Sequence, residues 1–574
     1  LGLQRLKIDD SLSELLRTNT PEFRIYQSVS ERFPSSEYDV LVVVEGKSLL
    51  APIGIEAFRG AMIDLNLADG VKGAISMLSA RGQPDKSGYA PPIIADQLPE
   101  GQAFAAAIQR LRNNDIVKGK FLSDDGELAL AVLALDRTEV EKHGLKKIIG
   151  GIDQTARAGL AGSGLSVKLT GAPVMQLEIR NAVERDQLLY NGLGFIVGVL
   201  IALAFFRSVP LMLMTALPPV LAIVWSLGAL GWLDFRLNLF LNVMTPLIMV
   251  MAFSDSMQIT CAVRDRLMAG DSKTAALRWA ILTVGPACVL TDATAGLSFV
   301  TLLISDSALI RSFGSAGAIS TLISYVAVIM VIPLMGVLLI RDGGSLARSA
   351  GSEDFAMNGV KRLCAAVTSH VVARPALLTL LGVLLVGVFG WLHFNLEPRY
   401  RLADQVPDRE QAIAAGARLD VKLTGANPIH VLIELPAGRE LYDPRTLDTI
   451  AAAHSIIEGQ SGVGNVWSLE TLRRWIAEKV GSKDTGILKQ YVAVLPEHLT
   501  RRFIAADKTA VVVTGRVPDK DASEILQIVR ALDAGLNKVR KADPGVTISV
   551  TGLSVIAAQN SGEMIGQIND SLTI

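Results

Sequence analysis

The stretch LLYNGLGFIVGVLIALAFF, residues 188–206, decides the fold of this chain because it runs for 19 residues without a charged side chain. A helix of about 20 apolar residues is long enough to cross the roughly 30 Å hydrocarbon core of a bilayer. Five more apolar stretches of sufficient length follow, so we predict six membrane-spanning helices. They cover residues 188–206, 209–230, 237–263, 281–304, 316–340 and 375–394.

The overall composition agrees with a protein that lies largely in lipid. Half of the 574 residues are hydrophobic and the mean hydropathy is +0.39, which is high for a soluble protein of this length. The 55 basic and 56 acidic residues balance, and we find no P-loop, so the sequence favours neither nucleic-acid binding nor nucleotide hydrolysis. The three cysteines lie in or beside the apolar block and the six histidines are scattered, so we expect no disulfides in the polar regions, no metal site and no cofactor.

The positions of Lys and Arg orient the predicted spans. Basic residues are concentrated in the connections after the first, third and fifth spans, whereas the alternate connections carry only Arg236 and Arg311. Connections rich in Lys and Arg face the cytoplasm. Both large polar regions, residues 1–187 and 395–574, are therefore expected on the opposite, outer side.

These two polar regions show the same segments in the same order. Short β-branched runs alternate with amphipathic stretches in both, a pattern typical of βαβ units. We therefore predict two repeated α/β domains of about four strands each. The matching segments are YDVLVVVEG (from Tyr38) with PIHVLIELPAG (Pro428), GVKGAISML (Gly70) with GVGNVWSLE (Gly462), FLSDDGELALAVLAL (Phe121) with FIAADKTAVVVTGRV (Phe503), and VKLTGAPVM (Val167) with ISVTGLSVI (Ile548).

The predicted organisation is an α-helical polytopic membrane protein. Along the chain, one soluble domain precedes the helix bundle and a second one follows it. In order, we expect an α/β domain at 1–187, a five-helix block at 188–340, a cytoplasmic link at 341–374, a sixth helix at 375–394 and a second α/β domain at 395–574. The first α/β domain runs directly into a membrane helix, and the second ends where the matching helix would begin. We therefore expect a fragment that lacks the first and the last five transmembrane helices of a longer protein.

This order of elements resembles the RND superfamily, and within it the MmpL-like (MMPL) branch of mycobacterial lipid exporters and hopanoid exporters. The block 188–340 also resembles the five-helix sterol-sensing-type unit of Patched and Dispatched. The most specific match is MVMAFSDSMQITCAVRDR, residues 249–266, which is similar to the family's Gly-x-Asp-Tyr motif followed by an Arg-rich helix end. In this chain Ser254 and Ser256 stand where the family more often has a Gly-type position and an aromatic hydroxyl. The segments VLTDATAGLSFVTLL (from Val289) and ALIRSFGSAGAIS (from Ala308) are similar to the signatures of the next two helices.

Asp255 is the main candidate site residue, because a carboxylate in mid-span costs roughly 2.5–3.5 kcal/mol and needs a partner or a function. The resemblance implies that Asp255 relays protons. Its candidate partners are Ser254, Ser256, Gln258, which we expect one turn along on the same face, and Asp292 on the next span. The alternative is that Asp255 only makes a structural hydrogen bond to a neighbouring helix.

The resemblance implies a proton-driven exporter, not an enzyme, in the bacterial inner membrane, with both α/β domains in the periplasm. Its substrate would be hydrophobic or amphiphilic and lipid-like, and its partners would be protons, membrane lipids and either further copies of the chain or a periplasmic accessory protein. One alternative is a sterol- or lipid-sensing receptor of the Patched type that transports nothing. Another is an accessory protein of the SecDF type, which uses the proton gradient to assist translocation.

Overall fold

The computed structural model describes most of the chain, and each statement below concerns the part that it describes. The chain divides into two compact units. The helical unit holds Leu1–Asp10, Arg180–Pro398 and Met564–Ile574, and the α/β unit holds Ser11–Ile179 and Arg399–Glu563. The described residues are 2–8, 17–18, 20–33, 38–82, 91–237, 241–305, 307–340, 355–394, 401–405, 411–481, 484–495 and 497–561.

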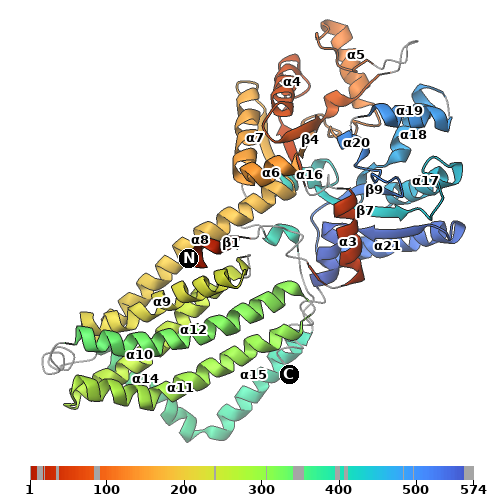
Figure 1. The fold of residues 1–574 in the computed structure, drawn as a ribbon. Helices are drawn as coiled ribbons and strands as arrows, with labels where there is room; N and C mark the ends of the chain where they lie inside the picture. Colours follow the sequence, from red (N-terminus) through yellow and green to blue (C-terminus); the bar gives the residue numbers. More distant parts are fainter. Residues whose placement is uncertain are drawn as a thin grey trace. The chain divides into compact units, whose positions relative to one another are not determined.

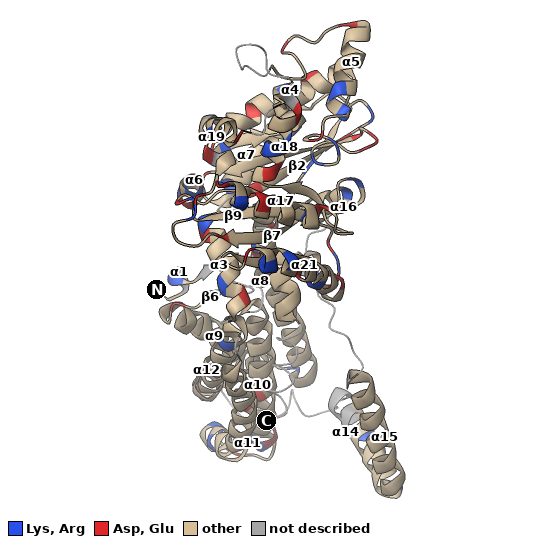
Figure 2. Ribbon diagram, turned by 90° about the vertical axis from the view of Figure 1, so that its right-hand side faces the viewer, with Lys and Arg blue, Asp and Glu red and all other residues tan. Residues whose placement is uncertain are grey.

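Six helices among the described residues are long and apolar enough to cross a membrane, which confirms the predicted number of spans. Lys, Arg, Asp and Glu are sparse along these helices and frequent over the α/β unit (Figure 2). The six segments are Ala172–Phe206, Val209–Trp232, Leu241–Met268, Lys273–Ile304, Ala308–Leu339 and Pro375–His393.

Four of these helices form a bundle in which α10 contacts all of the others (Figure 1). They are α9 (Val209–Trp232), α10 (Met244–Met268), α11 (Lys273–Thr301) and α12 (Ala308–Leu339). Helices α11 and α12 each begin eight residues before the predicted spans, from 273 instead of 281 and from 308 instead of 316. The first turns of both helices carry basic side chains, so hydropathy does not count them as part of the membrane span. The helical backbone hydrogen bonds nevertheless already run through these turns.

Helix α10 instead begins later than predicted, because the preceding residues take another conformation. Arg236–Leu237 form the short strand β6, which pairs in parallel with β1 (Lys7–Ile8). Helix α1 (Gly2–Arg5) packs against α9, where the backbone of Gly2 lies close to Gly228 and Gly231. The start of the described chain is therefore held against the helical unit.

Helix α8 (Ala172–Phe206) is continuous, and two glycines in its membrane-spanning part contact side chains of α10. A Cβ atom added to Gly194 would lie 2.5 Å from Met249, and one added to Gly198 would lie 2.6 Å from the ring of Phe253. Two small residues four positions apart allow such an approach between membrane helices.

The remaining helices of this unit are α14 (Phe355–Ala373) and the span α15 (Pro375–Phe394). Helix α14 occupies the described part of the predicted cytoplasmic link at 341–374, for which we predicted no secondary structure. Its side chains are exposed, so it buries little against the rest of the chain and hydropathy gives no signal for it.

The α/β unit contains two four-stranded sheets with the same strand order. With the strands of each sheet numbered along the chain, both sheets read 2-3-1-4. This agrees with the prediction of four strands in each polar region. The first sheet holds β2 (Asp39–Glu45), β3 (Val71–Ile75), β4 (Leu128–Leu135) and β5 (Ser166–Thr170), and the second holds β7 (Asn427–Glu434), β8 (Gly464–Trp467), β9 (Ala510–Val517) and β10 (Thr547–Thr551).

The prediction of plain βαβ units needs correction, because neighbouring strands in both sheets are antiparallel. Strands β2 and β3 run in the same direction, as a βαβ unit requires, but β4 lies between them. The arrangement is therefore a split βαβ motif. Periodicity alone does not distinguish the two, because both use strands of the same length and pattern.

Helices cover one face of each sheet and leave the other face for contacts across the unit. In the second sheet, Ile429, Val431 and Ile433 of β7 join the core under α17 (Pro444–Glu458) and α21 (Ala522–Ala542). The first sheet carries α4 (Pro52–Asn66) and α7 (Leu145–Gly159), which pack against each other. The other helices of the unit are α3 (Pro21–Arg32), α5 (Gly101–Arg112), α6 (Arg137–His143), α16 (Ala412–Lys422), α18 (Leu469–Lys479), α19 (Thr485–Val494) and α20 (Glu497–Thr500).

The two halves of the α/β unit exchange a helix. Helix α3 precedes the first sheet in the chain but buries Val29 and Phe33 against β7 and β9 of the second. Helix α16 precedes the second sheet but packs against β5 of the first. In α16, the ammonium group of Lys422 lies 3.2 Å from Glu45 and 2.8 Å from Asp125. The halves are thus joined by both apolar burial and ion pairs.

Candidate functional site

Asp255 lies on the buried face of α10, at the centre of the helix bundle. This face consists of residues that recur every three or four positions, such as Ile248, Ala252, Ile259 and Val263. The Asp255 residue is only 3% exposed. A carboxyl group in such apolar surroundings is stable only when it is neutral or has a partner.

The partner that the structure provides is Asp292 of α11, which is 7% exposed. The carboxyl groups of Asp255 and Asp292 are close enough for a side-chain hydrogen bond, and the thiol of Cys288 also lies within reach of Asp255. Cys288 and Asp292 are one turn apart on α11 and so share a face. Two adjacent carboxylates in a low-dielectric site cannot both be ionised, so the arrangement favours a pair that holds at least one proton.

Buried hydroxyl groups lie on α10 itself and on α12. Ser256 and Thr260 lie one turn apart on the buried face of α10, and Ser320 and Ser324 do the same on α12. Within the described part of the chain, none of these four hydroxyls has a hydrogen-bond partner. Buried polar groups normally bind protein atoms or ordered water, so hydroxyls in this environment suit a hydrated path.

Ser254 and Gln258 do not share the buried face of Asp255, contrary to the expectation for Gln258. Both are exposed, and the Gln258 amide donates a hydrogen bond to the hydroxyl of Ser254 over 3.4 Å. The structure therefore brings Asp255, Ser256 and Asp292 into the bundle and leaves the Ser254–Gln258 pair outside it.

A second polar cluster joins α8 to the start of α10. Gln187 donates to Asn242 over 2.7 Å, and Asn191 donates to Thr245 over 3.1 Å. Together with the close approach at Gly194 and Gly198, these bonds fix α8 against α10. This cluster therefore positions the helix that carries Asp255.

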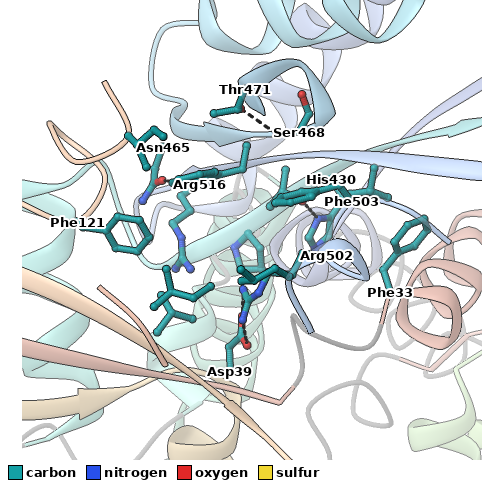
Figure 3. A pocket seen from close by; sticks show the side chains of 18 of the residues that line it. Phe33, Asp39, Phe121, His430, Asn465, Ser468, Thr471, Arg502, Phe503 and Arg516 are labelled. Atoms are coloured by element: carbon teal, nitrogen blue, oxygen red, sulfur yellow. Dashed lines mark hydrogen bonds and ion pairs between the residues drawn. The ribbon is translucent and has the colours of Figure 1, made fainter. Parts of the chain in front are cut away.

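The α/β unit contains a cavity of about 410 Å³, within the range usual for ligand pockets. Besides Ile75 of β3 and Asn465 and Trp467 of β8, four strands contribute mostly alternate residues to its wall, so one face of each sheet lines it. These residues are Asp39 and Leu41 of β2, Leu130 and Val132 of β4, Pro428 and His430 of β7, and Val512, Thr514 and Arg516 of β9. Aromatic side chains, including Phe33, Phe121 and Phe503, close the rest of the wall (Figure 3).

A buried ion pair crosses the cavity between the two halves of the unit. The guanidinium group of Arg502 binds both carboxylate oxygens of Asp39, each over 2.7 Å (Figure 3). The second arginine, Arg516, donates to the carbonyl of Ala426 over 2.9 Å. Burial lowers the pKa of Arg516 to about 10, so it still carries its charge at neutral pH. Burial also lowers the pKa of His430 to about 4, so the imidazole is neutral there.

Sequence analysis missed this cavity, although one signal was present. Arg516 is the only charged residue in the strand AVVVTGRV, which otherwise reads as a buried run. A charge on a buried strand indicates a special environment. Its neighbour Asp39 lies far away in the chain, and Arg502 precedes the strand, so no local pattern links either residue to it.

The six apolar helices of membrane-spanning length define a multi-pass membrane protein. The MMPL family profile matches residues 18–378, and the chain belongs to this family of transporter-type membrane proteins of the RND superfamily. The chain is also 23% identical over 172 residues to a protein of Methanocaldococcus jannaschii that is described as a membrane protein. That similarity covers 30% of this chain and 44% of the relative, so less than half of the relative's length is matched.

Proposed function

We propose that this protein is a proton-driven exporter of a hydrophobic or amphiphilic, lipid-like molecule, in which Asp255 and Asp292 together carry the proton. The observation that carries this proposal is the contact between these two carboxyl groups from α10 and α11 inside the bundle. A lone buried carboxyl would also suit a structural hydrogen bond. Two in contact cost more than either alone, so a function explains their retention better.

The mechanism follows from the charge states of the pair. When it gains or loses a proton, the repulsion between its members changes, and so does the preferred spacing of α10 and α11. A proton gradient can then do work, provided that the two protonation states favour different packings of the bundle. The hydroxyls of Ser256 and Thr260 offer a route for protons along the buried face of α10.

The location in the bacterial inner membrane, with the α/β unit on the periplasmic side, is part of the same proposal. Its support is the distribution of basic residues: Arg264 and Arg266 lie in the last turns of α10, and Lys273 begins α11. Clusters of this kind mark the cytoplasmic ends of membrane helices.

The proposal is tested by replacing each carboxyl group with the isosteric amide. The protein is reconstituted into liposomes that contain a pH-sensitive dye, and proton entry is followed after an imposed pH gradient. Asp255→Asn and Asp292→Asn should each abolish proton entry, because either change leaves one titratable group where two are needed. The matched control is Asp271→Asn, a half-buried carboxylate in the connection between α10 and α11 that pairs with Arg266 over 2.8 Å, and this variant should pass protons like the parent protein.

The result also separates the proposal from the two alternatives. Proton entry that persists in both variants would refute the relay. A parent protein that passes no protons but binds sterol or lipid would support a receptor of the Patched type. Proton entry without export of any lipid would support an accessory role of the SecDF type.

A further inference from the structure

The cavity of the α/β unit carries an excess of positive charge. Asp39 is the one carboxylate among the described residues that line it, whereas three arginines do so: Arg81, Arg502 and Arg516. Arg516 has a carbonyl as its hydrogen-bond acceptor and no carboxylate, and it feels the field of both Asp39 and Arg502. Burying a charge without a counter-charge is costly, so this arrangement suits an anion that arrives from outside the chain.

Buried donors without acceptors point in the same direction. The Nε of Arg502 and the indole Nε1 of Trp475 are both buried and have no hydrogen-bond partner in the part of the chain that the structure describes. Both residues line the cavity. Leaving a buried donor without an acceptor is costly, and a ligand with acceptor oxygens would recover this cost. Planar guanidinium groups match carboxylate and phosphate oxygens in particular.

The remaining wall suits an apolar body. Leu41, Leu130, Val132 and Val512 project from the strands, and rings such as Phe121 and Phe503 lie beside them (Figure 3). Pockets with a mostly apolar lining and a few convergent polar groups orient their ligand through the polar end. The charged groups in this wall are mainly cationic, and its apolar residues suit a hydrocarbon chain.

We propose that the cavity binds an anionic amphiphile, whose acidic head group lies on Arg516 and competes with Asp39 for Arg502. The identification of this amphiphile as the exported substrate rests on the proposed export function. Its binding to the cavity does not depend on transport. Asp39 belongs to the first half of the unit and Arg502 to the second. A ligand that takes over Arg502 therefore also releases the ion pair that joins the halves, and so couples occupancy to their contact.

The test is a competition experiment on the whole protein in phosphatidylcholine nanodiscs. Dansyl-undecanoic acid serves as the fluorescent probe, and dodecanoate, dodecanol and dodecylamine serve as competitors with the same chain and different heads. Empty nanodiscs correct for partition into lipid. Dodecanoate should compete at least about tenfold better than dodecanol, because a hydrogen bond to a charged group contributes about 1.5–3 kcal/mol. Dodecylamine should be the weakest of the three.

Variants connect this preference to the proposed residues. Arg516→Met should remove most of the preference for dodecanoate over dodecanol, and Arg530→Met, an exposed arginine on α21, should keep it. Asp39→Asn should strengthen dodecanoate binding, because it removes the competing carboxylate and frees Arg502. Thermal unfolding of each variant shows whether the unit remains folded, and the preference ratio is compared only among folded variants.

Equal competition by dodecanol and dodecanoate would overturn the proposal, as would an unchanged preference in folded Arg516→Met or weaker dodecanoate binding in folded Asp39→Asn. The proton relay is tested independently of the binding of dodecanoate to the cavity. Asp255→Asn should leave dodecanoate binding unchanged, so a protein that binds dodecanoate but passes no protons would retain the cavity assignment and lose the proton relay.

Discussion

Gly171 gives the sharpest test of how the α/β unit is built. It follows β5 with a φ of +107°, a conformation that side chains with a Cβ rarely adopt. A Cβ added there would also collide with the carbonyl oxygen of Asp39, which is backbone and has little freedom to move. The strain alone costs about 1–3 kcal/mol. The collision must add to it by forcing β5 away from β2, so Gly171→Ala should lower the free energy of unfolding by about 3 kcal/mol or more.

Two other glycines separate the strain from the collision. Gly162 has a φ of +77° but open space around its Cβ position, so Gly162→Ala carries the strain without the collision and should cost about 1–2 kcal/mol. Gly150 lies within α7, also with open space, so Gly150→Ala should stabilise by about 0.5–1 kcal/mol.

The assay is thermal unfolding of the purified protein at one fixed scan rate, because large membrane proteins unfold irreversibly and their midpoint depends on that rate. Tryptophan fluorescence reports on the α/β unit through Trp467 and Trp475. The midpoint should rise for Gly150→Ala, fall slightly for Gly162→Ala and fall most for Gly171→Ala. If Gly171→Ala lost no more than Gly162→Ala, the close approach of β5 to Asp39 would not constrain the fold.

Two further predictions concern pH and topology. Burial lowers the pKa of His430 from its ordinary 6.5 to about 4, so the unfolded chain takes up the proton first as pH falls, and His430 by itself should lower the free energy of unfolding by at most about 3 kcal/mol between about pH 6.5 and 4. Burial also lowers the pKa of His454 to about 4, so His454 adds a similar drop, and His430→Gln should flatten this part of the curve of stability against pH without removing its slope. An identical slope in the variant would contradict the burial argument. Cys364 is exposed on α14, so with Cys261 changed to Ser an impermeant maleimide should label it in inverted vesicles and not in intact spheroplasts. Lys489→Cys, on exposed α19, should show the reverse, and labelling of both residues from the same side would refute the proposed topology.

Hydropathy predicted the six spans because the energetic cost of polar groups in lipid is large and local in the sequence. Hydropathy placed the first residues of α11 and α12 eight positions too late, because the first turns of these helices carry polar side chains and precede the apolar stretch. The repeat was likewise visible, because TG at Thr170 and Thr551 precedes a turn that needs glycine. Gly552, with a φ of +140°, approaches the carbonyl of Pro428 as Gly171 approaches that of Asp39.

The contacts that matter for function were less accessible from sequence. Asp255 and Asp292 were each visible as polar residues in apolar stretches, but only helix packing determines that they meet. Gln258 faces outward because of how α10 is rotated about its own axis in the bundle. The weak pattern of polar residues along α10 does not specify this rotation. The pairing of Asp39 with Arg502 joins residues 463 positions apart, and it depends on how the two halves of the α/β unit assemble.

Because the two sheets share a strand order, matching positions in the two walls of the cavity can be compared for their effect on how an elongated ligand binds. In the first sheet Asp39 pairs across the strands with Ala134, and at the matching place in the second sheet Pro428 pairs with Arg516. A duplicated scaffold with identical walls would offer such a guest two equivalent directions of entry. Here the acid stands on one copy and the base on the other, so the two walls are not equivalent and such a guest meets a different charge on each.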